Sequence, residues 1–94
     1  MTKSGVISTI LAELYICDNP EGSTIQKLRF TNSAAYNLTL QLYIAEFKKI
    51  VSLYDLVLDA GDTVTDNMGY ELKFGDKLLA SSTAGKTFYS LKIV

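Results

Sequence analysis

The sequence contains no histidine and only one cysteine, Cys17, and these shortages exclude several kinds of chemistry. Without histidine, neither a Ser-His nor a Cys-His nucleophilic system can form within the chain. A zinc site would lack its usual ligands, because zinc is bound mainly by cysteine and histidine. A single cysteine cannot form an internal disulfide. The chain is therefore predicted to have no metal or other cofactor and not to be an enzyme, with paired carboxylates the one catalytic class left open.

Long apolar runs and a basic stripe are also missing. The apolar segment from Gly5 to Cys17 is interrupted by Glu13, and bulky Ile16 stands before the cysteine, so the segment fits neither a signal peptide nor a membrane span. The chain has nine Lys and Arg residues and ten Asp and Glu residues, and among the basic residues only Lys48 and Lys49 are adjacent in the sequence. We therefore predict synthesis in a cytoplasm without a secretion signal of its own, no membrane insertion and no nucleic-acid partner.

The length allows one hydrophobic core. A chain of 94 residues is predicted to form a single domain over residues 1–94. Domains of this size bury a modest share of their surface and are marginally stable alone. Disulfides and metals are not available as support, so contacts with other copies, in a homo-oligomer, are the expected source of extra stability.

The chain does contain an alternation of apolar and polar residues with a period of two, which is typical of half-buried strands. In the segment 37–44, aliphatic side chains at every second position face one way and mainly polar ones face the other. The segments 54–59 and 88–93 repeat this pattern, and 26–30 and 78–80 are compatible with it. The dominant secondary structure is therefore predicted to be β-strand.

Turn residues separate these runs about every ten residues. They occur at Asp18–Gly22, Thr31–Ser33, Ala60–Asp62, Asp66–Gly69, Gly75–Asp76 and Ala84–Lys86. Short strands at this spacing are typical of a two-sheet antiparallel β-sandwich, with jelly-roll or Ig-like topology and about seven or eight strands. For residues 7–14 a helix is the alternative, but several β-branched residues favour a strand. Residues 1–8 are a candidate N-terminal arm.

Two short motifs are interpreted structurally. Gly85-Lys86-Thr87 copies the end of a phosphate-binding loop, but position 80 is Ala80 where that loop needs glycine, so a turn is predicted. Four carboxylates, Asp55, Asp59, Asp62 and Asp66, do not have the spacing of a calcium loop and are interpreted as solvated strand ends. Cys17 is expected to be a buried, small apolar side chain.

Three aromatic residues are the candidate interface residues. Tyr43 and Phe88 fall on the polar faces of their predicted strands, and Phe47 lies in a charged connection. Exposed aromatic side chains are enriched at the centres of protein interfaces. Packing against a loop is the structural alternative for each.

Several segments, taken in order, carry a resemblance to a known class of proteins. They are Ala12–Tyr15, Ile25–Asn32, Leu38–Ile44, Leu58–Asp62 and Tyr70–Ala80. This order resembles small β-sandwich structural proteins of tailed bacteriophages, in which a strand ending in Thr-Asn leads to a strand of alternating Thr and aliphatic residues. In those proteins an Ala-Gly-acid turn then precedes a Leu-x-x-Gly-Asp-x-Leu stretch.

The resemblance implies a non-enzymatic virion component. A capsid decoration protein, a head-to-tail or tail-associated subunit or a fibre-attached domain would fit, located in the virion and contacting itself and other virion proteins. The alternative is a module of a phage fibre that binds a surface glycan or receptor, with tyrosines such as Tyr43 stacking on sugar and Asp66 and Asn67 forming hydrogen bonds. Loss of binding in Tyr43→Ala with folding intact would favour this alternative.

Overall fold

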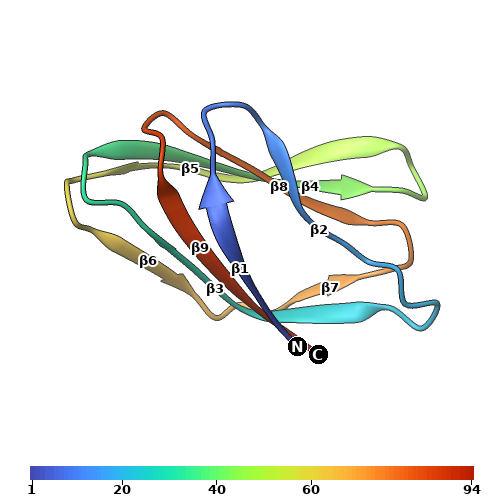
Figure 1. Cartoon of the computed structure of the whole chain (residues 1–94). Helices are drawn as coiled ribbons and strands as arrows, with labels where there is room; N and C mark the ends of the chain where they lie inside the picture. Colours follow the sequence, from blue (N-terminus) through green and yellow to red (C-terminus); the bar gives the residue numbers. More distant parts are fainter.

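Nine strands make up the regular structure of the chain (Figure 1). The computed structural model describes residues 1–94 and contains no helix, so none that could cross a membrane. The strands are β1 (Thr2–Ile7), β2 (Ala12–Ile16), β3 (Ser23–Thr31), β4 (Tyr36–Ile44), β5 (Lys49–Leu58), β6 (Thr63–Asp66), β7 (Tyr70–Leu72), β8 (Lys77–Ser82) and β9 (Thr87–Ile93).

The strands form two antiparallel sheets packed face to face. The five-stranded sheet has the order β1-β9-β3-β6, with β7 also paired to β3, and the four-stranded sheet has the order β2-β8-β4-β5. The predicted two-sheet β-sandwich is therefore confirmed. The strand count is nine because β7, only three residues long, adds a short pairing beside β3.

The connections decide between the two predicted topologies. β1, β2, β3 and β4 alternate between the sheets, and only β4–β5 and β6–β7 remain within one sheet. An Ig-like sandwich instead keeps its first two strands in the same sheet. Apart from the short β7, the eight strands form two four-stranded layers in the order of a jelly roll.

Alternation in the sequence fixes which side chains enter the core. In β4, Leu38 and Leu40 are fully buried, whereas Asn37 is exposed. In β9, Leu91 and Ile93 are buried and Lys92 is exposed. Because neighbouring residues of a strand point to opposite faces, every second residue contributes to the space between the sheets.

Residues 7–14 form neither the predicted continuous strand nor the alternative helix. β1 ends at Ile7, residues 8–11 form a loop, and β2 begins at Ala12 in the other sheet. The Ser8 hydroxyl accepts a hydrogen bond from the Ile10 N–H, and the Ile10 side chain is 75% exposed. The apolar spacing in this segment therefore comes from two strands that bury Ile7 and Leu14 separately. Of residues 1–8, the candidate arm, those from Thr2 to Ile7 pair with β9 as an edge strand.

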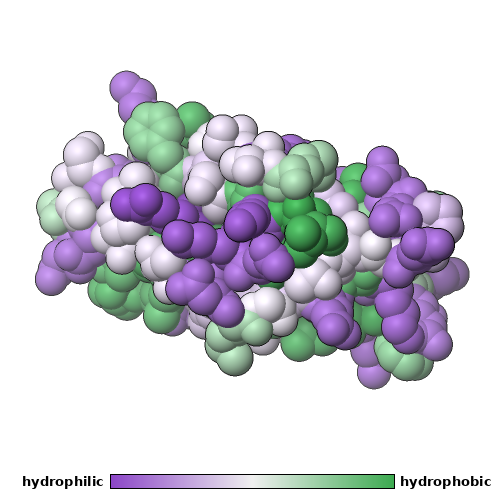
Figure 2. All heavy atoms as spheres, turned by 90° about the horizontal axis from the view of Figure 1, so that it is seen from below, coloured by the Kyte–Doolittle hydropathy of each residue, from purple (hydrophilic) through white to green (hydrophobic).

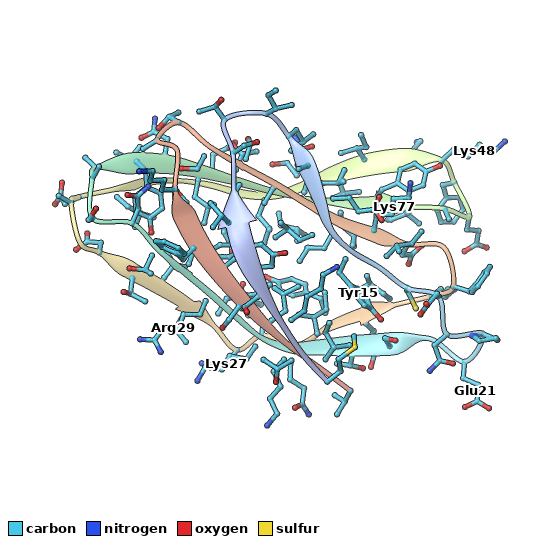
Figure 3. All side chains as sticks on the ribbon, viewed as in Figure 1. Tyr15, Glu21, Lys27, Arg29, Lys48 and Lys77 are labelled. Carbon is cyan, nitrogen blue, oxygen red and sulfur yellow. The ribbon has the colours of Figure 1, made fainter.

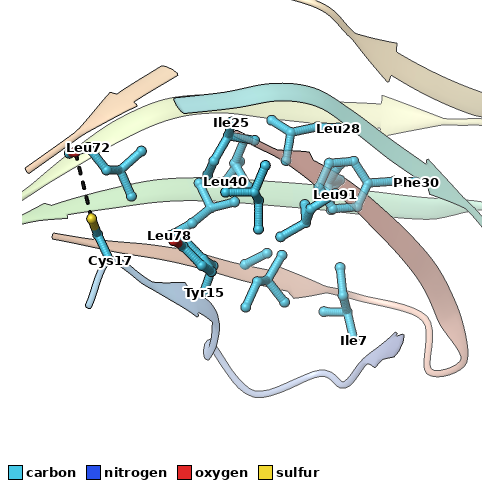
Figure 4. Close-up of a cluster of buried hydrophobic side chains, with 14 of the residues drawn as sticks. Ile7, Tyr15, Cys17, Ile25, Leu28, Phe30, Leu40, Leu72, Leu78 and Leu91 are labelled. Atoms are coloured by element: carbon cyan, nitrogen blue, oxygen red, sulfur yellow. Dashed lines mark hydrogen bonds between the residues drawn. The ribbon is translucent and has the colours of Figure 1, made fainter. Parts of the chain in front are cut away.

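The core lies between the sheets and receives side chains from both (Figure 4). Phe30 and Leu28 from β3 are fully buried, as are Leu40 from β4 and Leu78 from β8. Each large apolar side chain buried in this way contributes about 1.5–3 kcal/mol. Cys17 lies at the end of this cluster with its Sγ 3.7 Å from the Leu72 carbonyl oxygen, which confirms its expected burial.

A polar network closes one end of the sandwich. The Asn32 side-chain amide donates to Thr87 Oγ1 at 2.8 Å and to the Gly85 carbonyl oxygen at 3.1 Å. The Thr87 hydroxyl in turn donates to Ser82 Oγ at 2.8 Å. Asn32, Ser82 and Thr87 are all buried, and no buried side-chain polar atom in the chain lacks a partner. The network joins the β3–β4 and β8–β9 connections.

Substitution of Gly22 tests the close approach of two turns. Gly22 has a φ of 88°, and a Cβ there would lie 2.8 Å from the Leu72 carbonyl oxygen. Gly61 has a similar φ of 81° but no atom within 4 Å of such a Cβ. We expect Gly61→Ala to lower the free energy of unfolding by about 1–2 kcal/mol through backbone strain alone. Gly22→Ala should cost about 2–5 kcal/mol, because crowding adds to the strain. Urea unfolding measures both, and equal losses would contradict the contact.

Candidate functional site at the open sheet edges

The sandwich has open strand edges on two sides. β1 and β6 end the five-stranded sheet, and β2 and β5 end the four-stranded sheet. Residues 8–11 join β1 to β2 on one side, and residues 59–62 join β5 to β6 on the other. An edge strand presents unpaired N–H and C=O groups that can pair with another chain. The edges are therefore the places where the fold itself leaves hydrogen-bonding capacity unused.

β5 is the longest of these edges and the least protected. It runs for ten residues, contains no proline and has charged side chains only at Lys49 and Asp55. Three of its apolar residues are exposed: Ile50 at 56%, Val51 at 42% and Val57 at 84%. β5 has one bulge, at Leu53, opposite the step from Leu40 to Gln41 of β4. Natural edges are usually shortened or charged.

The other edges are better protected. β6 has only four residues. β2 has five residues and a bulge between Glu13 and Tyr15, and the Glu13 carboxylate forms an ion pair with Lys77 at 3.8 Å. β1 contains Lys3 and faces solvent along most of its length. The contrast makes β5 the strongest candidate for a contact between chains.

The three predicted interface aromatics do not form one patch. Tyr43 is half-buried on the outer face of the four-stranded sheet, with Lys77 Nζ 5.7 Å from its ring centre. Phe47 is 63% exposed in the β4–β5 turn. Phe88 is 55% exposed on the other sheet, where it lies opposite Val6 of β1. The candidate residues therefore belong to separate surfaces.

Sequence reasoning missed a second exposed aromatic residue in the turn that lies next to the turn of Phe47. Phe74, in the β7–β8 turn, is 62% exposed. The two turns lie together, because the Lys73 ammonium and Glu46 carboxylate are 3.6 Å apart and the Ala45 N–H donates to Asp76 Oδ1. The turn composition gives no signal for this neighbourhood, which depends on the packing of distant loops.

Three of the four clustered carboxylates have separate hydrogen-bond partners. Asp55 Oδ1 accepts from the Thr39 hydroxyl at 2.8 Å across the β4–β5 ladder. Asp62 Oδ2 accepts from the Asp59 N–H at 3.2 Å within a turn. Asp66 is bonded to two tyrosines and a backbone N–H. No group of three or more acids and thiols is arranged to hold a metal ion.

Asp66 joins the two sheets at the β6–β7 corner. The Tyr70 hydroxyl donates to Asp66 Oδ2 at 2.6 Å, and the Tyr54 hydroxyl from β5 donates to the same oxygen at 3.2 Å. Burial, together with the hydrogen bond to Asp66, raises the pKa of Tyr70 to about 12. Burial and the charge of Asp66 also raise the pKa of Tyr54. Asp66 is therefore engaged internally, and its sugar-binding role in the glycan alternative would require breaking these bonds.

The raised pKa values of Tyr54 and Tyr70 predict that the protein loses stability in alkali. The folded state keeps these protons above pH 10, the ordinary pKa of tyrosine, while the unfolded state releases them. Unfolding is therefore favoured as pH rises, and we expect the free energy of unfolding to fall between about pH 10 and 12. Tyr54→Phe combined with Tyr70→Phe should reduce this slope. Part of the slope should remain, because burial also raises the pKa of Tyr36. Urea unfolding at fixed pH values measures the slope, and an unchanged slope in the double variant would refute the assignment.

One open groove lies at the end of the sandwich opposite the Asn32 network. It has a volume of about 940 Å³, and its lining includes Glu21, Glu46, Glu71, Lys73 and Phe74. Asp76, at its base, uses both carboxylate oxygens to accept the N–H groups of Ala45 and Lys73. The groove therefore has an acidic rim and a base whose polar groups are already paired.

The Gly85-Lys86-Thr87 segment forms a turn and the start of β9. Lys86 has a φ of 62°, and Thr87 is fully buried in the Asn32 network. In a phosphate-binding loop the corresponding hydroxyl would face the ligand. Here it is bonded to the protein, so the predicted turn is confirmed.

Comparison with known proteins adds information about the fold. No family model and no curated protein sequence matches the chain. Among solved structures, the chain is similar to one described as "Bacillus endospore appendages form a novel family of disulfide-linked pili", with a TM-score of 0.54 and 9% sequence identity. The match covers 99% of this chain and 80% of the other chain. At this identity the likeness shows a shared sandwich fold.

Proposed function

We propose that the protein is a non-enzymatic structural subunit that assembles with copies of itself through its open sheet edges. The observation that carries this proposal is β5, a ten-residue edge strand with exposed Ile50, Val51 and Val57 and few protecting charges. Pairing of this edge would satisfy backbone groups and bury apolar side chains in one contact. The small size of the domain supports the proposal, because neighbouring subunits would add stability.

The arrangement of the edges permits a head-to-tail contact. β5 ends one side of the four-stranded sheet and β2 ends the other. When β5 of one copy pairs with β2 of the next, the sheet continues from copy to copy. A head-to-tail contact of this kind produces rings or filaments rather than closed two-fold dimers. The proposed contact is therefore suited to a repeating assembly.

We further propose that this assembly is part of a tailed bacteriophage virion, as a capsid decoration, head-to-tail or tail-associated subunit. The sequence resemblance over Ile25–Asn32, Leu38–Ile44 and Tyr70–Ala80 supports this setting. The similar Bacillus structure is described as a pilus, which is also an assembly of repeated subunits and supports the broader proposal of self-assembly. Detection of the chain in purified phage particles by mass spectrometry would test the setting.

Charge placed on the β5 edge should prevent assembly. Ile50→Lys with Val57→Lys introduces two lysines at positions whose side chains are 56% and 84% exposed, so the fold should tolerate both substitutions. A matched control is Ile10→Lys with Met68→Lys, whose side chains are 75% and 83% exposed in loops. We expect the edge variant to weaken self-association at least about tenfold and the control variant to weaken it less. Sedimentation over a range of concentrations measures both.

Two outcomes would contradict the proposal. A wild-type protein that stays monomeric at the highest accessible concentration, and does not bind purified phage particles, would remove its basis. Equal effects of the edge and control variants would show that net charge, rather than β5, controls association. Circular dichroism of all variants checks that folding is intact.

Cys17 argues against a covalent link between subunits. The thiol is fully buried and lies within 3.6–3.8 Å of Ser23 Oγ, the Leu72 carbonyl oxygen and the Asn19 carbonyl oxygen. A disulfide between two chains requires Cα atoms within about 7 Å, which two buried sites cannot reach without local unfolding. Assembly of this chain is therefore proposed to be noncovalent.

Removal of the thiol should leave assembly unchanged. We expect Cys17→Ser and wild type to show the same assembly, with and without dithiothreitol, because the serine hydroxyl can use the same acceptors. Sedimentation and non-reducing gel electrophoresis provide the readouts. A dithiothreitol-sensitive dimer band that disappears in Cys17→Ser would overturn the noncovalent proposal.

A further inference from the structure

The outer face of the five-stranded sheet carries a group of three cations that come from opposite ends of the sequence. Lys27 and Arg29 lie two positions apart on β3, so both point to the outer face, about 7 Å apart along the strand. Lys92 of β9 is the direct cross-strand partner of Lys27. All three side chains are exposed, and Figure 3 shows Lys27 and Arg29 projecting away from the sheet.

None of the three cations has an acidic partner. The two ion pairs of the structure join Lys73 to Glu46 and Lys77 to Glu13. Glu71 of β7 lies opposite Thr24 of β3 and forms no ion pair with the three cations. Like charges directly opposite one another on neighbouring strands are destabilising. The Lys27–Lys92 pair therefore costs the isolated subunit stability, and a bound anion would relieve that cost.

Hydroxyl groups surround the cations. Ser90 is the cross-strand partner of Arg29 on one side, and Thr65 is its partner on the other. Ser4 of β1 pairs with Ser90 and extends the same row. The space-filling view from this side shows hydrophilic side chains gathered over the middle of the face (Figure 2). Charged groups among exposed hydroxyls can bind both the anionic and the hydroxyl groups of a polymer.

We propose that this face binds an anionic polysaccharide, with Lys27, Arg29 and Lys92 contacting its carboxylate or sulfate groups. The backbone positions of the three residues are about 5–7 Å apart across and along the strands. Their long side chains can therefore reach charges on successive units of an extended glycan. A nucleic acid is less favoured, because Phe88 is the one aromatic side chain on the outer face of β3 and β9, whereas binding of a single strand uses several aromatic side chains that stack on successive bases. The face remains open when the edges pair, so the inference does not rest on assembly.

Neutralisation of the three cations should abolish binding. The test variant combines Lys27→Gln, Arg29→Gln and Lys92→Gln, and the matched control combines Lys48→Gln, Lys49→Gln and Lys86→Gln, which removes the same charge from exposed positions in two connections and at the start of β5. The probes are fluorescent heparin and polygalacturonate, with dextran as the neutral polymer, at about 50 mM salt. We expect the test variant to weaken binding at least about tenfold and the control about twofold or less.

A second variant separates binding from stability. Lys92→Glu places opposite charges across the β3–β9 ladder and should raise the melting temperature by a few degrees while it weakens polysaccharide binding. No binding of either anionic probe by wild type would overturn the inference. Equal losses in the test and control triple variants, or tighter binding of single-stranded DNA or phosphatidylglycerol vesicles than of both probes, would also overturn it.

Discussion

The pairing of β3 with β9 is the constraint on which the rest of the structure depends. It joins residues that are 57 to 68 positions apart in sequence, from Thr31 with Phe88 to Ile25 with Ile93. On the inner face it places Leu28 beside Leu91, and at its end it brings Asn32 within hydrogen-bonding distance of Thr87. β9 also holds β1, so the first and last strands lie side by side (Figure 1). Because such pairing closes a long loop, folding is expected in milliseconds to seconds.

The sequence predicts local structure well because alternation is a local property. The segment Leu38–Ile44 could be assigned to a half-buried strand from its own residues, and the turn at Ala60–Asp62 from its own composition. Residues 7–14 are predicted as one strand, with a helix as the alternative, because nothing local indicates that two short strands from different sheets are joined there by residues 8–11. The predicted number of strands is lower than the observed nine, because a strand of three residues such as β7 is too short to show an alternation of apolar and polar residues.

The surfaces could not be predicted because they depend on strand order. The alternation of Lys27 and Arg29 with Leu28 and Phe30 indicates an outward face, but nothing local indicates that Lys92 is the neighbour of Lys27. In the same way, Phe47 and Phe74 share one end of the sandwich only because their turns pack together. Asp66 was interpreted as a solvated strand end, and the structure places two tyrosine hydroxyls against it. Each of these neighbourhoods joins segments that the topology brings together.

The difference between the two sides of the four-stranded sheet has a consequence for any polymer built from it. One side is the ten-residue β5 with exposed Ile50, Val51 and Val57, and the other is the five-residue β2, whose Glu13 is paired with Lys77. A row of copies joined through unlike sides has a direction, because one terminus of the row always presents β5 and the other always presents β2. Its two tips then differ in chemistry, and a cap or an anchor that recognises one tip would leave the other free to grow.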